Sequence, residues 1–157
     1  MSRIWLMVIA ILMAGAAVPA SAQSPELEQA RNELQAGRDQ IILEELRMSP
    51  EQRAEFWPIY RAYVARLAPL RDRKAELVRQ FVAAYEAGEF DDEFAEWLIE
   101  ENFAIKEAWL GVQKEFQAGF RTVLPVQEVA RFYQLENKMD AEIEAELAVF
   151  VPLMEAD

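Results

Sequence analysis

The stretch that decides the fold is residues 48–88, MSPEQRAEFWPIYRAYVARLAPLRDRKAELVRQFVAAYEAG. It begins with the signals of a helix start: Ser49 is a capping residue, Pro50 suits the first helical position, and Gln52 completes a capping box. It ends at Gly88, the residue type that most readily takes the left-handed conformation of a helix terminator. Apolar residues recur at helical spacing in between, so the stretch predicts one long helix.

Two prolines interrupt this predicted helix. Each removes an intrahelical hydrogen bond, at a cost of about 3 kcal/mol unless the helix bends. Pro58 lies near the helix start, where the cost is small, but Pro69 lies well inside it. We therefore expect a bend around residues 64–70, with a break into two helices as the alternative.

Outward from this stretch the helical spacing continues on both sides, and no run alternates with the two-residue period of a strand. The predicted helices cover about residues 26–47, 50–87, 92–123 and 126–150. The two middle helices are long for a bundle of this size. The predicted fold is therefore all-α, with four helices in two long antiparallel hairpins, elongated and curved, and no sheet.

The N-terminal segment has the pattern of a secretory signal peptide. Arg3 precedes an apolar run over residues 4–13, and Ala20-Ser21-Ala22 fits the small-residue cleavage pattern. The run is too short for a stable membrane span, although an uncleaved anchor is the alternative. We expect residues 1–22 to be removed on export and residues 23–157 to form a single helical domain.

The composition excludes several classes of function. The chain has 157 residues with no His and no Cys, which rules out His-dependent nucleophilic triads, zinc fingers and disulfides. The five glycines are scattered and form no phosphate-binding loop. A formal net charge of −12 argues against nucleic-acid binding. We predict no enzyme activity, no catalytic residue, no cofactor and no metal site, and leave open weak binding of hard cations to the acidic C-terminal half.

Charge is distributed unevenly about Gly88. The preceding helix is rich in basic residues, whereas the residues that follow are acidic as far as Lys106. One interpretation is a basic strip that meets an acidic or unfolded polypeptide, with binding that weakens in salt. Its candidate residues are Arg66, Arg71, Arg73 and Lys74.

The alternative interpretation is that these charges hold the hairpin in register. Folding the two middle helices back at the turn places Arg79 near Glu96 and Lys74 near Glu101. Each exposed pair contributes only about 0–1 kcal/mol, so such pairs specify the pairing of the helices more than they stabilise it.

Three charged residues fall inside the predicted apolar stripes: Lys74, Glu101 and Glu136. An isolated buried charge is costly, so each must be paired or reach water. One interpretation is a buried polar layer that fixes the register of the helices. The other is that the stripe is open to solvent there, as in a binding groove.

The third helix also has a second apolar strip, formed by Ile99, Phe103 and Leu110. These residues lie roughly opposite the main stripe of that helix at 100° per residue. A helix that is apolar on two sides must be covered on both or must expose a patch. A sandwiched central helix and an exposed binding surface are both possible, and a second copy of the chain covering the strip is the interpretation we favour.

The motif Met48-Ser49-Pro50-Glu51-Gln52 resembles the Leu-Thr-x-x-Gln motif of the Spy/CpxP family of periplasmic proteins, with Met for Leu and Ser for Thr. Leu124-Pro125-Val126-Gln127 is similar to a second copy of the motif but lacks its Thr. The resemblance spans residues 26–150 and implies helical hairpins that intertwine as a curved, cradle-shaped homodimer. It also implies ATP-independent chaperoning or envelope-stress and metal-stress signalling. The chain departs from the family in its acidity and in lacking the His of metal-responsive relatives.

Two hypotheses about function follow. In the first, the chain is a non-enzymatic periplasmic chaperone or envelope-stress protein that binds unfolded polypeptides on a helical cradle. In the alternative, it is a periplasmic sensor or inhibitor subunit of a membrane signalling or metal-stress system. Both hypotheses use the same candidate surface.

Overall fold

The computed structural model describes residues 25–149 and 151–153, so the predicted signal peptide lies outside the described residues. The described chain forms four helices and contains no strand: α2 (Pro25–Glu45), α3 (Pro50–Ala87), α4 (Asp92–Val123) and α5 (Val126–Ala148). The predicted all-α fold is confirmed. The helix bounds lie within two residues of the predicted ranges, although α5 ends before residue 150 and α2 ends at Glu45.

Capping residues and a glycine set the ends of α3 and the start of α4 at the predicted positions. Ser49 caps α3 by accepting a hydrogen bond from the backbone N–H of Gln52, whose own side chain accepts from the Ser49 N–H. Gly88 follows α3 with φ of 67°, a conformation that costs glycine no side-chain clash. Asp91 caps α4 by accepting from the N–H of Phe94 at 2.8 Å.

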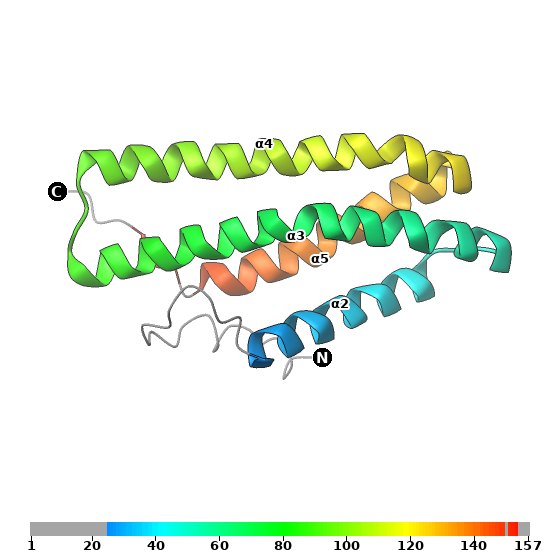
Figure 1. Ribbon diagram of the computed structural model, residues 1–157, viewed down its shortest axis with the longest axis horizontal. Coiled ribbons are helices and arrows are strands. Elements are labelled where there is room, and N and C mark those ends of the chain that lie inside the picture. The colour runs from blue at the N-terminus through cyan, green and yellow to red at the C-terminus, as the bar shows by residue number, and fades with distance from the viewer. Residues whose placement is uncertain (1–24, 150, 154–157) are drawn as a thin grey trace.

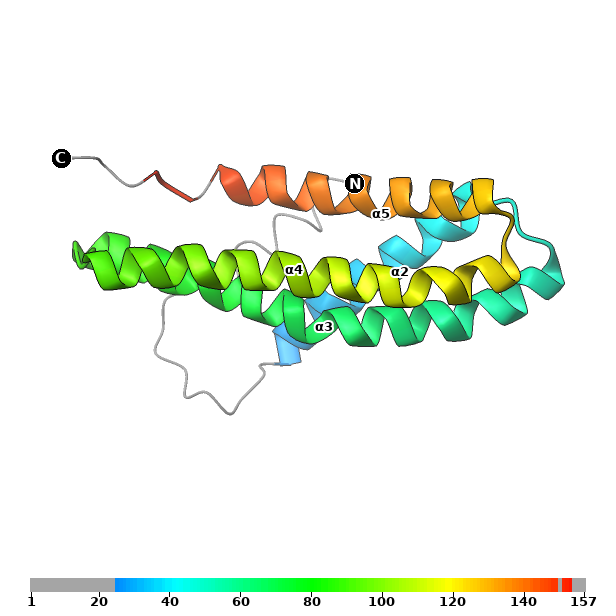
Figure 2. The same ribbon diagram turned by 90° about the horizontal axis from the view of Figure 1, so that it is seen from above.

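The two prolines bend α3 without breaking it. The helix is continuous from Pro50 to Ala87, and Figure 2 shows it as a bowed rod. Pro58 and Pro69 are both exposed and are eleven residues apart, which places them on the same outer side of the helix. Water can therefore reach the carbonyl groups that lose their helical partner there. The structure thus excludes the alternative of a break at Pro69.

The four helices form two antiparallel pairs. α3 and α4 lie side by side along their length (Figure 1). α2 and α5 form the other pair, because Arg38 contacts Glu136 and Asp140 while Glu45, further along α2, contacts Arg131 near the start of α5. The second pair therefore joins the first and last helices, which are not consecutive in the chain. In Figures 1 and 2 the closed end of the α3–α4 hairpin extends past the start of α2 and the end of α5.

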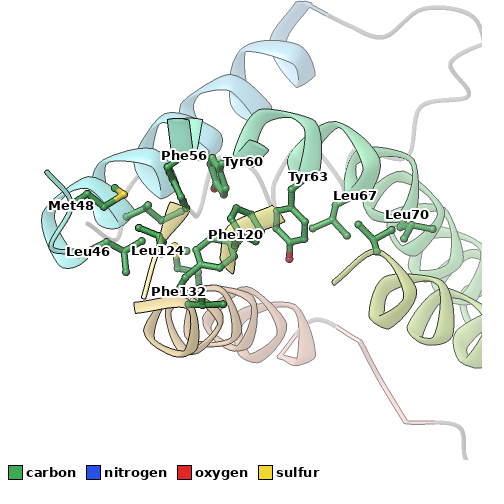
Figure 3. Packing of buried hydrophobic residues seen from close by; sticks show 14 residues of the cluster. Leu46, Met48, Phe56, Tyr60, Tyr63, Leu67, Leu70, Phe120, Leu124 and Phe132 are labelled. Carbon is green, nitrogen blue, oxygen red and sulfur yellow. The ribbon is translucent and has the colours of Figure 1, made fainter. Parts of the chain in front are cut away.

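The core is aromatic and lies toward the end of the molecule where α2 meets α3 and α4 meets α5 (Figure 3). Phe120 and Phe132 have ring centroids 4.5 Å apart, and Phe56 packs against both rings. Tyr60 and Tyr63 extend this cluster along α3, and all five side chains are almost completely buried. Such ring pairs add about 0.5–1.5 kcal/mol each beyond the area they bury.

Candidate functional site

The capping motif at residues 48–52 has a structural role. Met48 is buried in the core, and Pro50 occupies the first turn of α3. The Gln52 side chain both closes the capping box and donates to the Val123 carbonyl at 3.2 Å. The motif therefore ties the start of α3 to the end of α4. At the second motif-like stretch, α5 begins after Pro125 without a side-chain cap.

The second apolar strip is exposed on α4. Ile99, Phe103 and Leu110 retain 58, 63 and 48% of their accessible surface, and no element of the described chain seals them. The core residues of α4, Ile105, Val112 and Phe120, lie on its opposite side. An exposed apolar strip on a protein surface is a candidate interaction site.

The four residues of the predicted basic strip do not form one free surface. Arg66 pairs with Glu115 at 3.2 Å, and Arg73 makes two hydrogen bonds to Glu101, at 2.9 and 2.8 Å. Lys74 pairs with Glu144 on α5. Three of the four positive charges are thus already matched to carboxylates of α4 or α5.

The fourth member, Arg71, is half-buried and stacks over Trp109, with its guanidinium carbon 5.6 Å from the ring centroid. Its Nη2 atom is buried without a hydrogen-bond partner. Burial lowers the pKa of Arg71, and the neighbouring positive charge of Arg38 lowers it further.

The predicted pairings across the hairpin are wrong in register. Glu101 pairs with Arg73 rather than Lys74, and Arg79 pairs with Glu76 on its own helix rather than with Glu96. Adjacent side chains on a helix point about 100° apart. If the register between α3 and α4 shifts by one residue, Arg73 instead of Lys74 faces Glu101. The register of two facing helices depends on how they pack, which a projection of each helix by itself does not give.

Of the three residues assigned to a polar layer, only Glu136 is buried. It is fully inaccessible and accepts a hydrogen bond from Nη2 of Arg38 at 3.0 Å, while Nη1 of Arg38 donates to Asp140 at 2.9 Å. Lys74 and Glu101 lie in partly exposed ion pairs with other partners. The structure therefore does not bring the three predicted residues together.

Burial and neighbouring charges shift the pKa values of both members of the buried pair. Burial raises the pKa of Glu136 above its ordinary value, and the positive charge of Arg38 opposes this only in part. The second carboxylate oxygen, Oε1, is buried without a hydrogen-bond partner. Burial alone would lower the pKa of Arg38, but the charges of Glu136 and Asp140 outweigh it and raise that pKa. Nearby Tyr60 is also desolvated, which raises its pKa to about 12.

Arg38, the partner of Glu136, is not among the residues predicted from the sequence. A usable signal was present, because Arg38 lies four residues before the buried Ile42 and so falls on the buried side of α2. Helix periodicity could not identify Glu136 as its partner, because periodicity describes one helix at a time and the two residues are about a hundred residues apart in the chain.

A second feature is the open inner side of the distal hairpin, defined here as residues 71–104. An open stripe at Lys74 and Glu101 was one of the two alternatives predicted from the sequence, but no aromatic residue was assigned to it. No residue in this segment is fully buried, although it continues the apolar stripes of both helices. Its ring contacts form a continuous chain, with neighbouring centroids 5.4–6.3 Å apart. We call these residues the distal aromatic cluster: Phe81, Tyr85, Phe90, Phe94 and Trp97.

The described residues contain no group of three or more His, Cys, Asp or Glu side chains placed to hold a metal ion. A mostly apolar depression between α3 and α4 is lined by Ile59, Phe116 and Gly119 and is broadly open to solvent rather than enclosed. No helix among the described residues is long and apolar enough to cross a membrane. The candidate functional features are the exposed strip on α4 and the inner side of the distal hairpin.

Comparison of the chain with protein-family models, with curated proteins and with solved structures finds no match.

Proposed function

We propose that this protein is a non-enzymatic, ATP-independent chaperone-like protein of the periplasm that binds exposed apolar segments of other polypeptides. The observation that carries the proposal is the exposed strip of Ile99, Phe103 and Leu110 on the outer side of α4. The strip runs along a rigid helix whose opposite side is anchored in the core. Unfolded chains expose apolar side chains of varied sequence, and a linear apolar strip can contact these without specific pockets.

We further propose that a second copy of the chain covers the strip when no client is bound. Burial of apolar surface at a pairing interface contributes roughly 25 cal/mol per Å², which favours covering the strip in the absence of a client. The resting protein is then a homodimer, and a client competes with the second copy for the same residues. We also propose that residues 1–22 are removed on export. The small-residue pattern at Ala20-Ser21-Ala22 supports this cleavage.

An aggregation assay tests the chaperone activity. A chemically denatured model enzyme is diluted into buffer with a several-fold molar excess of the protein, and light scattering is followed. We expect suppression of aggregation without added nucleotide. The variant I99Q/F103Q/L110Q should lose at least half of this suppression, because glutamine keeps the helix propensity but removes the apolar contacts.

A matched control is L43Q/V126Q, which replaces two exposed apolar residues outside the strip. It should suppress aggregation as well as the unaltered protein. Circular dichroism checks that both variants keep their helix content. Absence of suppression by the unaltered protein would reject the chaperone proposal, and equal suppression by the strip variant would reject the assignment of the strip.

A further inference from the structure

The distal hairpin leaves partly exposed an apolar surface whose continuation over the core is covered by other helices. Tyr85 is 36% exposed, and the other members of the distal aromatic cluster are half-buried. In the core, the inner stripes of α3 and α4 are covered by α2 and α5, and Phe56, Tyr60 and Phe120 become almost fully buried. Beyond Leu70 on α3 and before Ile105 on α4 no residue is fully buried. Both figures of the whole molecule show the closed end of the hairpin projecting past the two covering helices.

The shape of the surface suits a helix. The missing cover continues the positions that α2 and α5 occupy over the core, and both of these elements are helices laid on the α3–α4 pair. A further amphipathic helix placed on the distal aromatic cluster would complete the same packing. Helices that insert one apolar face into a groove between two others are a common mode of peptide recognition.

The negative charge around the surface favours a positively charged partner. Between Phe81 and Ile105 the chain has eight carboxylates and no basic residue. Within the part of the chain that the structure describes, Glu101 is the one of these carboxylates that forms an ion pair, with Arg73. Glu93 and Glu100 lie four residues before and three residues after Trp97, so they are its neighbours on the helix surface. A partner with positive charges beside its apolar face gains attraction at this end of the molecule.

We propose that the distal aromatic cluster is a docking site for a cationic amphipathic helix supplied by another polypeptide. The other occupants are disfavoured by charge. Two copies of the chain meeting at their hairpin ends would bring like charges together, and the chain's own C-terminal residues add Glu155 and Asp157. A surface of anionic lipid would also be repelled. The proposal does not depend on the chaperone assignment, because the exposed strip lies on the opposite side of α4.

The test uses an amphipathic helical peptide of leucine and lysine carrying a fluorescent label, titrated with the full chain and followed by anisotropy. We expect saturable binding with one peptide per chain, weakened at least tenfold when salt shortens the Debye length from about 30 Å to about 8 Å. A peptide of the same composition in scrambled order, which forms no apolar face, should bind at least fivefold more weakly. A leucine–glutamate peptide should not bind.

Two variants locate the site. W97A should weaken binding at least fivefold through lost apolar contact. E93Q/E96Q/E100Q should weaken it at least fivefold through lost charge, and all three of these side chains are exposed, so the fold should not change. The control E44Q/E55Q/E107Q removes the same number of exposed negative charges outside the distal hairpin and should bind the peptide unchanged.

Several outcomes would overturn the proposal. Equal weakening by the control variant would show attraction to net charge rather than to a site. Equal binding of the scrambled peptide would exclude helix docking. Peptide binding that is lost in I99Q/F103Q/L110Q but kept in both distal variants would place it on the other side of α4. Dissociation of a dimer by the distal variants, without peptide binding by the unaltered chain, would show that a second copy occupies the surface.

Discussion

Arg38 and Glu136 form the buried contact between α2 and α5, in addition to the exposed pair of Glu45 and Arg131. Their side chains are 2 and 0% exposed, and Asp140 provides the second carboxylate for the same guanidinium. Removing two charges from water costs several kcal/mol per ion, which their mutual attraction offsets only when the remaining polar atoms are also satisfied. Here Nε of Arg38 and Oε1 of Glu136 lack partners. The pair therefore specifies how the helices pack more than it stabilises the fold.

The pH dependence of stability should report on Glu136. Burial raises its folded-state pKa above the value near 4.5 expected in the unfolded chain, with Arg38, Arg71 and Asp140 as its charged neighbours. The folded state then binds the proton more tightly than the unfolded state. Its contribution to stability is greatest below pH 4.5 and is lost as the pH rises through the folded pKa. In E136Q this loss should be absent.

Urea unfolding of the two proteins across the acidic to neutral range measures the effect. The free energy of unfolding of the unaltered chain, minus that of E136Q, should fall as the pH rises above about 4.5. The control E142Q removes an exposed carboxylate from the same helix and should give a nearly constant difference. A difference between the chain and E136Q that increases with pH would contradict a raised pKa.

At the scale of the element, α3 shows how local signals set the length of a helix. Its start is fixed by a reciprocal capping box, with Gln52 N–H to Ser49 Oγ at 3.2 Å and Ser49 N–H to Gln52 Oε1 at 2.9 Å. Its end is fixed by the positive φ of Gly88. These two points also determine where the hairpin turns and therefore how far it projects beyond α2 and α5.

The variant S49A should destabilise the protein by about 1 kcal/mol, because one N–H group at the start of α3 loses its acceptor. S49T retains a hydroxyl at the same position and should stay within a few tenths of a kcal/mol of the unaltered protein. The midpoint of urea unfolding, with an unchanged slope, measures both effects. Equal stabilities of S49A and S49T would show that the capping box contributes nothing to the fold.

At the scale of the whole molecule, the core is concentrated at one end, and two apolar surfaces outside it are not covered by other helices of the described chain. The α4 members of the distal aromatic cluster, Phe94 and Trp97, lie on the side of α4 away from the exposed strip, and the other members lie on α3 and in the turn. These two apolar surfaces, one of them surrounded by negative charge, are the basis of the two binding proposals.

Solution mass tests the proposed pairing through the strip. Light scattering should give the mass of two chains for the unaltered protein at high concentration and that of one chain for I99Q/F103Q/L110Q. Adding a denatured client should shift the unaltered protein from the dimer toward a complex of one chain with the client, because both occupants use the same strip. A protein that stays monomeric at millimolar concentration would exclude the dimer, and the aggregation assay would still decide the chaperone activity.

The amino-acid sequence by itself determined the all-α fold, the four helices and the ends of the two long ones. It did so because periodicity, caps and terminators act over a few residues: Ser49, Gln52 and Gly88 need only their neighbours to perform these roles. The position of Ile99, Phe103 and Leu110 away from the main stripe of α4 was also indicated, because it follows from helix geometry alone. Whether another helix of the chain covers them was left open, and their exposure came from the tertiary structure.

Only the tertiary structure decided which charges meet and where the core ends. The partner of Glu136 is Arg38, about a hundred residues earlier in the chain, and the partner of Glu101 is Arg73 on the facing helix. Likewise, Phe81 and Trp97 continue stripes that look like core in the sequence, and they stay half-exposed because α2 and α5 do not reach them. Burial and pairing depend on the paths of distant helices through space, which local sequence does not encode.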